Sequence, residues 1–236
     1  MSHAGGVSAI ERRLRKVTDD EFLRYYPRLY HVAEGGIWAS VQQFGLESTS
    51  ALLDRFDVRG PERDAIESRR RATSITLTHK SFGSVVIRDQ APISDAKLAR
   101  CLDGMTTAEW YRMLNGLVFL WPSIERRNGM LISYNDQRHD VLTIDSQKLL
   151  AQYSDQLRLS PINSGSTQYN AVLRGQNTFV RINDCPFSEW QRRRKKRAAE
   201  VVAEIVVPYR LRAIKEVVVR VESYFGTQCT GTVWEA

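Results

Sequence analysis

The amino-acid sequence predicts an α+β fold with a split, mainly antiparallel sheet and flanking helices. Helix patterns come early and lie between strands, whereas the second half of the chain is rich in strand patterns. The strand candidates are short and follow one another without crossover helices, which favours antiparallel pairing. A chain of 236 residues, 42% hydrophobic and 26% charged, can bury a core of its own. We expect an N-terminal helical extension over residues 1–27 and a single domain over residues 28–236.

Most of the predicted helices lie in the first half of the chain. Thr18 and Glu21 have the spacing of a capping box, which predicts a helix that runs to about Tyr26 and ends before Pro27. A second capping-box pattern, at Thr106 and Glu109, precedes a helix expected over 107–114. The other elements expected here are a strand over 29–32, helices over 36–44, 50–56 and 61–71, strands over 74–77 and 84–88, and a helix over 95–102.

Strands dominate the predicted second half. An apolar run with two aromatic residues predicts a strand over 118–121, and Ser123 is a suitable N-cap for the helix after it. The remaining expected elements are a strand over 140–144, a helix over 146–153, and strands over 157–159, 178–182, 201–207 and 214–221.

The chain carries a positive charge that is partly concentrated in one segment. Its formal net charge is +7, with an isoelectric point near 9.5. A basic run of six consecutive residues contains Arg192, Arg193, Arg194, Lys195, Lys196 and Arg197. Such a run can neutralise phosphates and release their counterions, which predicts contact with a nucleic acid. The alternative is a solvated helix face that serves only solubility.

The sequence does not fit several classes of protein. No apolar run approaches the roughly 20 residues needed to cross a bilayer, and the N-terminus lacks the apolar segment of a secretory signal. We therefore expect a cytoplasmic protein without membrane contact. Cys101, Cys185 and Cys229 are odd in number and far apart, so we expect reduced, incidental thiols. The four histidines form no HxH or HxxxH pair, so we expect no metal.

Residues near the first predicted strand are suited to a binding cleft. Tyr30 and His31 lie in this strand near its end, and Gly45, Leu46 and Ser48 follow the next helix. A histidine at a strand end, backed by a helix, can place its ring in a cleft. Taken alone, however, a single histidine is more often structural.

Two further segments carry groups that suit a nucleotide. Arg69 and Arg70 lie at the end of the helix predicted over 61–71, and the planar fork of a guanidinium matches a pyrophosphate better than an ammonium does. A solvated helix terminus is the alternative for both arginines. Phe119 and Trp121 lie in the strand over 118–121, where an aromatic face can stack on a planar heterocycle or simply fill the core.

The most informative residue is Glu204, which lies inside an otherwise apolar strand. A carboxylate is costly to bury there unless it is paired or used in chemistry. Strand alternation places Val202, Glu204 and Val206 on one face, so Glu204 can reach a cleft at the edge of the core. Glu200, beside the basic run, is the nearest rival for a catalytic role.

Taken together, these segments resemble the ADP-ribosyltransferase fold. They are similar to motifs of the poly(ADP-ribose) polymerases, the RNA 2′-phosphotransferases and, most of all, the DarT-type DNA ADP-ribosyltransferases. The resemblance extends over residues 28–222. The chain as a whole also resembles a related bacterial family that has no assigned activity.

The resemblance implies an ADP-ribosyltransferase-like domain that uses NAD as its substrate and needs no metal. In the family, the glutamate holds the ribose 2′-hydroxyl and stabilises an oxocarbenium-like transition state, a role that Glu204 would take. Arg69 or Arg70 would serve the phosphates and the reaction. The NAD-binding residues implied are Tyr30, His31, Ser48, Phe119 and Trp121.

The activity implied is that of a mono-ADP-ribosyltransferase that modifies DNA or RNA, as a toxin or a phage-defence effector. Whether an antitoxin or a hydrolase partners it is left open by the sequence. Two alternatives keep the same fold. One is an inactive nucleic-acid-binding module, and the other is an enzyme that transfers ADP-ribose to protein or to water.

Overall fold

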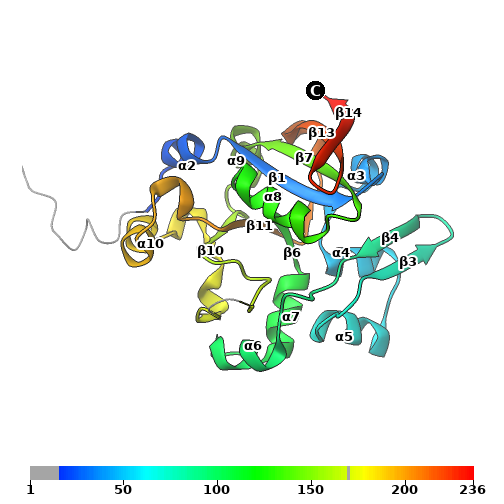
Figure 1. Cartoon of the computed structure of the whole chain (residues 1–236), viewed down its shortest axis with the longest axis horizontal. Coiled ribbons are helices and arrows are strands. Elements are labelled where there is room, and N and C mark those ends of the chain that lie inside the picture. The colour runs from blue at the N-terminus through cyan, green and yellow to red at the C-terminus, as the bar shows by residue number, and fades with distance from the viewer. Residues whose placement is uncertain (1–15, 169–170) are drawn as a thin grey trace, which may run out of the picture.

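Two four-stranded antiparallel sheets form the framework of the protein (Figure 1). The structure is a computed structural model that describes residues 16–168 and 171–236. Strand order in the first sheet is β1 (Arg28–Glu34), β7 (Arg138–Asp145), β13 (Val218–Phe225), β14 (Gln228–Glu235). Strand order in the second sheet is β10 (Val180–Arg181), β8 (Arg158–Ser160), β11 (Glu204–Pro208), β6 (Leu117–Leu120). With the flanking helices, these sheets confirm the predicted α+β class.

The two sheets meet where β1 passes the end of β6. The N–H of Tyr30 donates to the carbonyl oxygen of Trp121 over 2.9 Å, and the N–H of Trp121 donates back to Tyr30 over 2.7 Å. The sheets are thus split, with a bridge between their edge strands. This bridge brings the strand that carries His31 beside the strand that carries Phe119.

Helices cover the sheets, and their ends follow local sequence signals. The α-helices among the described residues are α2 (Asp19–Tyr25), α3 (Trp38–Phe44), α4 (Thr49–Arg55), α5 (Gly60–Ser68), α6 (Asp95–Cys101), α7 (Thr107–Asn115), α8 (Ile124–Ser133), α9 (Ser146–Tyr153), α10 (Phe187–Arg194) and α11 (Ile214–Val217). Both predicted capping boxes, at the starts of α2 and α7, are confirmed. Gly45 ends α3 with a φ of 85°, and a side chain there would collide with the carbonyl of Leu211.

The main hydrophobic core lies between the two sheets and the helices around them. Phe22 and Tyr26, from α2 and the residue after it, are fully buried in this core. The Tyr26 hydroxyl donates to the carbonyl of Ala198 over 2.9 Å and accepts from the N–H of Val202 over 3.3 Å. The described part of the predicted N-terminal extension therefore packs as an integral layer of the core. Residues 1–15 lie outside the described part of the chain.

A hairpin and two helices enclose a second, smaller hydrophobic core. Strands β3 (Ile75–His79) and β4 (Gly83–Ile87) pair with each other and share a separate apolar cluster with α4 and α5. The hairpin projects from the sheets on the same side as α5 (Figure 1). Residues 88–94 lead from β4 back to α6 and thus form a strap between the hairpin and the helical layer.

Several elements differ from the sequence prediction. The stretch over 214–221, expected as one strand, begins with the short helix α11 and becomes β13 only at Val218. Strand β14 was not predicted, because most of its residues are exposed and lack an apolar alternation. The strand expected over 178–182 is reduced to β10 between two 3₁₀ turns. Two-residue pairings complete the fold: β2 (Leu46–Glu47) with β12 (Arg210–Leu211), and β5 (Leu102–Asp103) with β9 (Arg174–Gly175).

Candidate functional site

A cavity of about 690 Å³ lies at the junction of the two sheets, the hairpin strap and α8. Ligand pockets in proteins typically hold roughly 300–1,000 Å³, so this cavity is large enough for a dinucleotide. Five residues singled out from the sequence line it: His31, Ser48, Phe119, Trp121 and Glu204. They come from both sheets and from the start of α4, so the fold collects them from distant parts of the chain.

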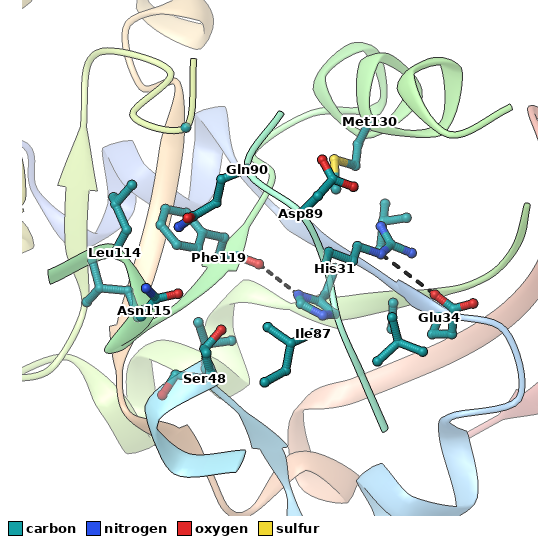
Figure 2. Close-up of a pocket in the computed structure, with 18 of the residues that line it drawn as sticks. His31, Glu34, Ser48, Ile87, Asp89, Gln90, Leu114, Asn115, Phe119 and Met130 are labelled. Carbon is teal, nitrogen blue, oxygen red and sulfur yellow. Dashed lines mark hydrogen bonds and ion pairs between the residues drawn. The ribbon is translucent and has the colours of Figure 1, made fainter. Parts of the chain in front are cut away.

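His31 projects from β1 and is fixed by the neighbouring sheet. Its Nδ1 lies 2.8 Å from the carbonyl oxygen of Phe119 (Figure 2). Because a carbonyl can only accept, Nδ1 carries the proton and Nε2 is left as an acceptor. Burial lowers the pKa of His31 to about 4, and the positive charge of Arg88 acts in the same direction. The ring is therefore neutral at physiological pH.

Glu204 begins β11 and is 1% exposed. Both of its carboxyl oxygens accept from the backbone N–H of Ser164, over 3.0 and 3.1 Å. Burial raises the pKa of Glu204 to about 7, while the hydrogen bonds of Ser164 and the charges of Arg126 and Arg174 act against that rise. A carboxyl group of this kind changes its charge near neutral pH, which is a property expected of a functional group.

The partner of Glu204 belongs to a polar loop whose position the sequence did not reveal. Arg174 is 3% exposed, and its Nη1 donates to the carbonyls of Ser164 and Ser166, each over 3.0 Å. Thr167 ties the same loop to the strap through its hydroxyl, which accepts from the N–H of Ser94 over 2.7 Å. The loop is therefore held from two sides, and its residues 163, 165, 166 and 168 line the cavity.

Of the three consecutive arginines at residues 69–71, Arg71 lines the cavity, whereas Arg69 and Arg70 do not. Helix α5 ends at Ser68, so the next two side chains leave on the exposed side. Arg70 donates to the carbonyl of Ala91 over 3.0 Å at the surface. Arg71 is 7% exposed, and its guanidinium donates to the carbonyls of Ile66 and Arg88 over 2.7 and 3.2 Å. Burial lowers the pKa of Arg71 to about 10, so it remains a cation at neutral pH.

A second arginine, Arg88, lines the cavity in a fixed position. Its Nη2 donates to Nδ1 of the buried His139 over 2.8 Å, and its guanidinium lies 5.0 Å from the ring centroid of Tyr134. Glu34 pairs with its Nε at 4.0 Å. Within residues 16–168 and 171–236, nothing accepts a hydrogen bond from its buried Nη1. The sequence held no signal for Arg88, because its burial depends on β7 and α8.

The aromatic and hydroxyl residues predicted for the site have different environments. Ser48 is buried, and its hydroxyl oxygen accepts from the N–H of Ala51 over 3.2 Å at the start of α4. Tyr30 does not line the cavity, because its side chain alternates with that of His31 along β1. Its ring instead contacts Arg127, whose guanidinium carbon lies 5.3 Å from the ring centroid.

The basic run lies at the end of α10, outside the lining of the cavity. Of its six residues, Arg192, Arg193, Lys195, Lys196 and Arg197 are exposed. Arg193 pairs with Glu189 at 2.5 Å, and Arg197 pairs with Glu200. Arg194 is partly buried, and this burial lowers its pKa, with a smaller effect in the same direction from the positive charge of Arg126. Arg126 itself lines the cavity, whereas none of the six residues of the basic run does.

Other groups considered from the sequence have ordinary roles in the structure. All three cysteines are free, with Cys229 exposed and the other two buried. Among residues 16–168 and 171–236, no three His, Cys, Asp or Glu side chains gather in a way that suits a metal ion. In the same ranges, no helix is long and apolar enough to cross a membrane.

The fold and the cavity define the class: an α+β protein with a buried glutamate, a neutral histidine and four arginines (Arg55, Arg71, Arg88 and Arg126) around one pocket. The chain belongs to a family of unknown function (DUF7002), whose family model matches residues 27–218. That match includes every strand and helix that contributes to the cavity. No curated protein matches the chain.

Proposed function

We propose that the protein consumes NAD and transfers its ADP-ribose to a nucleic acid. The observation that carries this proposal is the cavity itself, which His31 and Glu204 line from two different sheets. A histidine acceptor and a carboxylate in one pocket suit a ribose, whose hydroxyls donate hydrogen bonds and whose anomeric carbon becomes positive as its bond breaks.

Glu204 supplies the electrostatic part of the reaction. When the bond between nicotinamide and ribose breaks, its electron pair leaves with the pyridine nitrogen, and positive charge develops on the ribose. A buried carboxylate stabilises this charge far better than an exposed one, because little water screens it. An acceptor atom then bonds to the anomeric carbon and loses its proton to solvent. His31 binds a ribose hydroxyl through Nε2 and positions the sugar.

Arg71 and Arg88 are the groups we assign to the phosphates of NAD. Both line the cavity, both are held by hydrogen bonds to other parts of the fold, and both stay charged. Fixed guanidinium groups lose little entropy when they bind a pyrophosphate. These two residues replace the Arg69 and Arg70 of the sequence-based expectation.

The basic run supports a nucleic acid as the acceptor. Five of its six cations are exposed, so they are accessible to the phosphates of a polyanion. This chemistry fits an enzyme of the cytoplasm, where NAD and nucleic acids are both available. Such an enzyme would serve as a toxin or a phage-defence effector.

A panel of acceptors tests the proposal. The protein is incubated with NAD and, separately, with single-stranded DNA, duplex DNA, RNA, total protein or no acceptor, and adducts are detected by mass spectrometry. We expect ADP-ribose on one of the nucleic acids. Adducts on protein, or hydrolysis of NAD alone, would show that protein or water, and not a nucleic acid, is the acceptor. Salt-dependent binding of nucleic acid without any loss of NAD would favour the inactive binding module.

A further inference from the structure

Two side-chain amides, Gln90 and Asn115, line the cavity with their orientations fixed by the surrounding backbone. Gln90 belongs to the hairpin strap, and Asn115 ends α7. Figure 2 shows both side chains in the part of the cavity that also contains Phe119 and Leu114. Neither residue has a role in the reaction described above.

The side chain of Gln90 presents a hydrogen-bond donor to the cavity. Its backbone N–H donates to the carbonyl of Arg71 over 2.7 Å, and its side-chain Oε1 accepts from the N–H of Arg71 over 3.3 Å. A backbone N–H needs an acceptor, so this contact assigns the oxygen of the amide and leaves Nε2 on the other side. Among the described residues, none accepts a hydrogen bond from this Nε2.

Asn115 has the opposite polarity. Its Nδ2 donates to the carbonyl of Glu67 over 3.0 Å, and the carbonyl of Ile66 lies at 3.5 Å. Because a carbonyl oxygen can only accept, the amide atom that faces these two carbonyls is the nitrogen, and the oxygen Oδ1 is left as an acceptor. No residue in the described ranges donates to Oδ1, although the side chain is 3% exposed. The two amides are also connected, because Arg71 donates to Ile66 through its side chain and to Gln90 through its backbone.

We infer that Gln90 and Asn115 recognise one edge of a planar amide or amidine that carries a donor and an acceptor side by side. Gln90 donates to the acceptor of the ligand, and Asn115 accepts from its N–H. The ring of Phe119, which lines the same cavity, offers an apolar face to the plane of such a group. Naming the ligand rests on the proposed function. NAD carries an adjacent donor and acceptor on two of its groups.

The two sources within NAD are the carboxamide of nicotinamide and the edge of adenine. The carboxamide offers a carbonyl oxygen and an N–H, and adenine offers a ring nitrogen and an exocyclic N–H. Nicotinic acid lacks the N–H, and hypoxanthine exchanges donor and acceptor. A site that leaves its own polar groups unpaired rejects such analogues strongly.

Binding of the separate fragments tests the inference without any turnover. Calorimetry or ligand-observed NMR on the full chain compares nicotinamide with nicotinic acid, and adenosine with inosine. We expect the native fragment of one pair to bind at least about tenfold more tightly than its analogue, the worth of one hydrogen bond of about 1.4 kcal/mol. Gln90→Met removes the donor without adding a charge that would itself repel nicotinic acid, so this preference should vanish. Gln43→Met, an exposed change on α3, should leave it intact.

Each outcome has a clear meaning. Preference for nicotinamide assigns the pair to the carboxamide, and preference for adenosine assigns it to the base. Equal binding within both pairs, or a preference that survives in a folded Gln90→Met protein, overturns the inference even if the enzyme consumes NAD. Conversely, a preference that depends on Gln90 in a protein that leaves NAD intact would retain the inference and remove the proposed function.

Discussion

The backbone N–H of Ser164 donates to both carboxyl oxygens of Glu204, which lies 40 residues later in the chain. This contact holds an almost fully buried glutamate at the base of the cavity. It also leaves the carboxyl group with one backbone donor and no direct ion pair in the described ranges. The burial is therefore only partly compensated, and the group titrates near neutral pH.

The first prediction concerns the stability of the protein as a function of pH. The pKa of Glu204 is raised from 4.5 to about 7 on folding, so the folded state binds more protons between these values. The free energy of unfolding should therefore fall as the pH rises from 4.5 through 7, by at most about 3 kcal/mol from this group. Glu204→Gln, which can still accept from Ser164, should lack this component. Urea unfolding of both proteins between pH 4.5 and 8 measures the difference, and parallel curves would contradict the prediction.

A second prediction concerns the tautomer of His31. His31→Asn retains an amide donor near the position of Nδ1 and can keep the bond to the carbonyl of Phe119, but it loses Nε2. Loss of one acceptor for a ribose hydroxyl should raise the KM for NAD by about tenfold. Steady-state kinetics on a variant with an unchanged circular dichroism spectrum checks this. An unaltered KM would show that Nε2 does not contact the substrate.

The third prediction separates three neighbouring arginines. Arg71→Lys should lower kcat/KM for NAD by at least about tenfold, because an ammonium cannot replace the buried fork of hydrogen bonds. The matched variants Arg69→Lys and Arg70→Lys change exposed side chains and should stay within about threefold of the wild type. Thermal unfolding controls for misfolding of the buried variant. A larger effect at Arg69 or Arg70 than at Arg71 would contradict the assignment.

The fourth prediction concerns the salt dependence of nucleic-acid binding. We expect weaker binding, and a shallower slope of log Kd against log salt, when four exposed cations of the basic run are replaced by alanine. Each phosphate that is no longer neutralised by a cation of the run should reduce the slope by roughly 0.9 for duplex DNA. The four residues are Arg192, Arg193, Lys195 and Lys196. A matched control replaces exposed cations elsewhere, namely Arg24, Lys148, Arg212 and Lys215.

If both quadruple variants lose affinity equally, the binding reflects net charge alone and the basic run has no special part. Consumption of NAD without an acceptor should be unchanged in the first variant, because its four side chains lie outside the cavity.

Local signals were sufficient to predict most of the elements. The capping boxes at Thr18 and Thr106 satisfy N–H groups within three residues, so no distant contact is needed to recognise them. The position of Glu204 at a cavity could also be predicted, since burying an acidic side chain in an apolar strand is costly unless the side chain has a partner or a use there. The start of β13 could not be predicted, because the valines around 217–219 suit a buried strand and a short buried helix alike.

The remaining parts of the site depend on contacts between distant segments. Which of three consecutive arginines is buried depends on the end of α5 and on the strap that returns to cover Arg71. Likewise, nothing in the sequence indicated that Ser164 would face Glu204, or that Gln90 and Asn115 would face the same cavity. These placements arise from tertiary packing, which has no fixed spacing along the chain.

Release of nicotinamide from NAD is the measurement that tests the central claim most directly. Wild-type protein, Glu204→Gln and the control Glu200→Gln are compared with NAD and the preferred nucleic acid. The account predicts release by the wild type and by Glu200→Gln, and a rate at least about 100-fold lower for Glu204→Gln. No release by folded wild-type protein with any acceptor, or equal rates for wild type and Glu204→Gln, would contradict it.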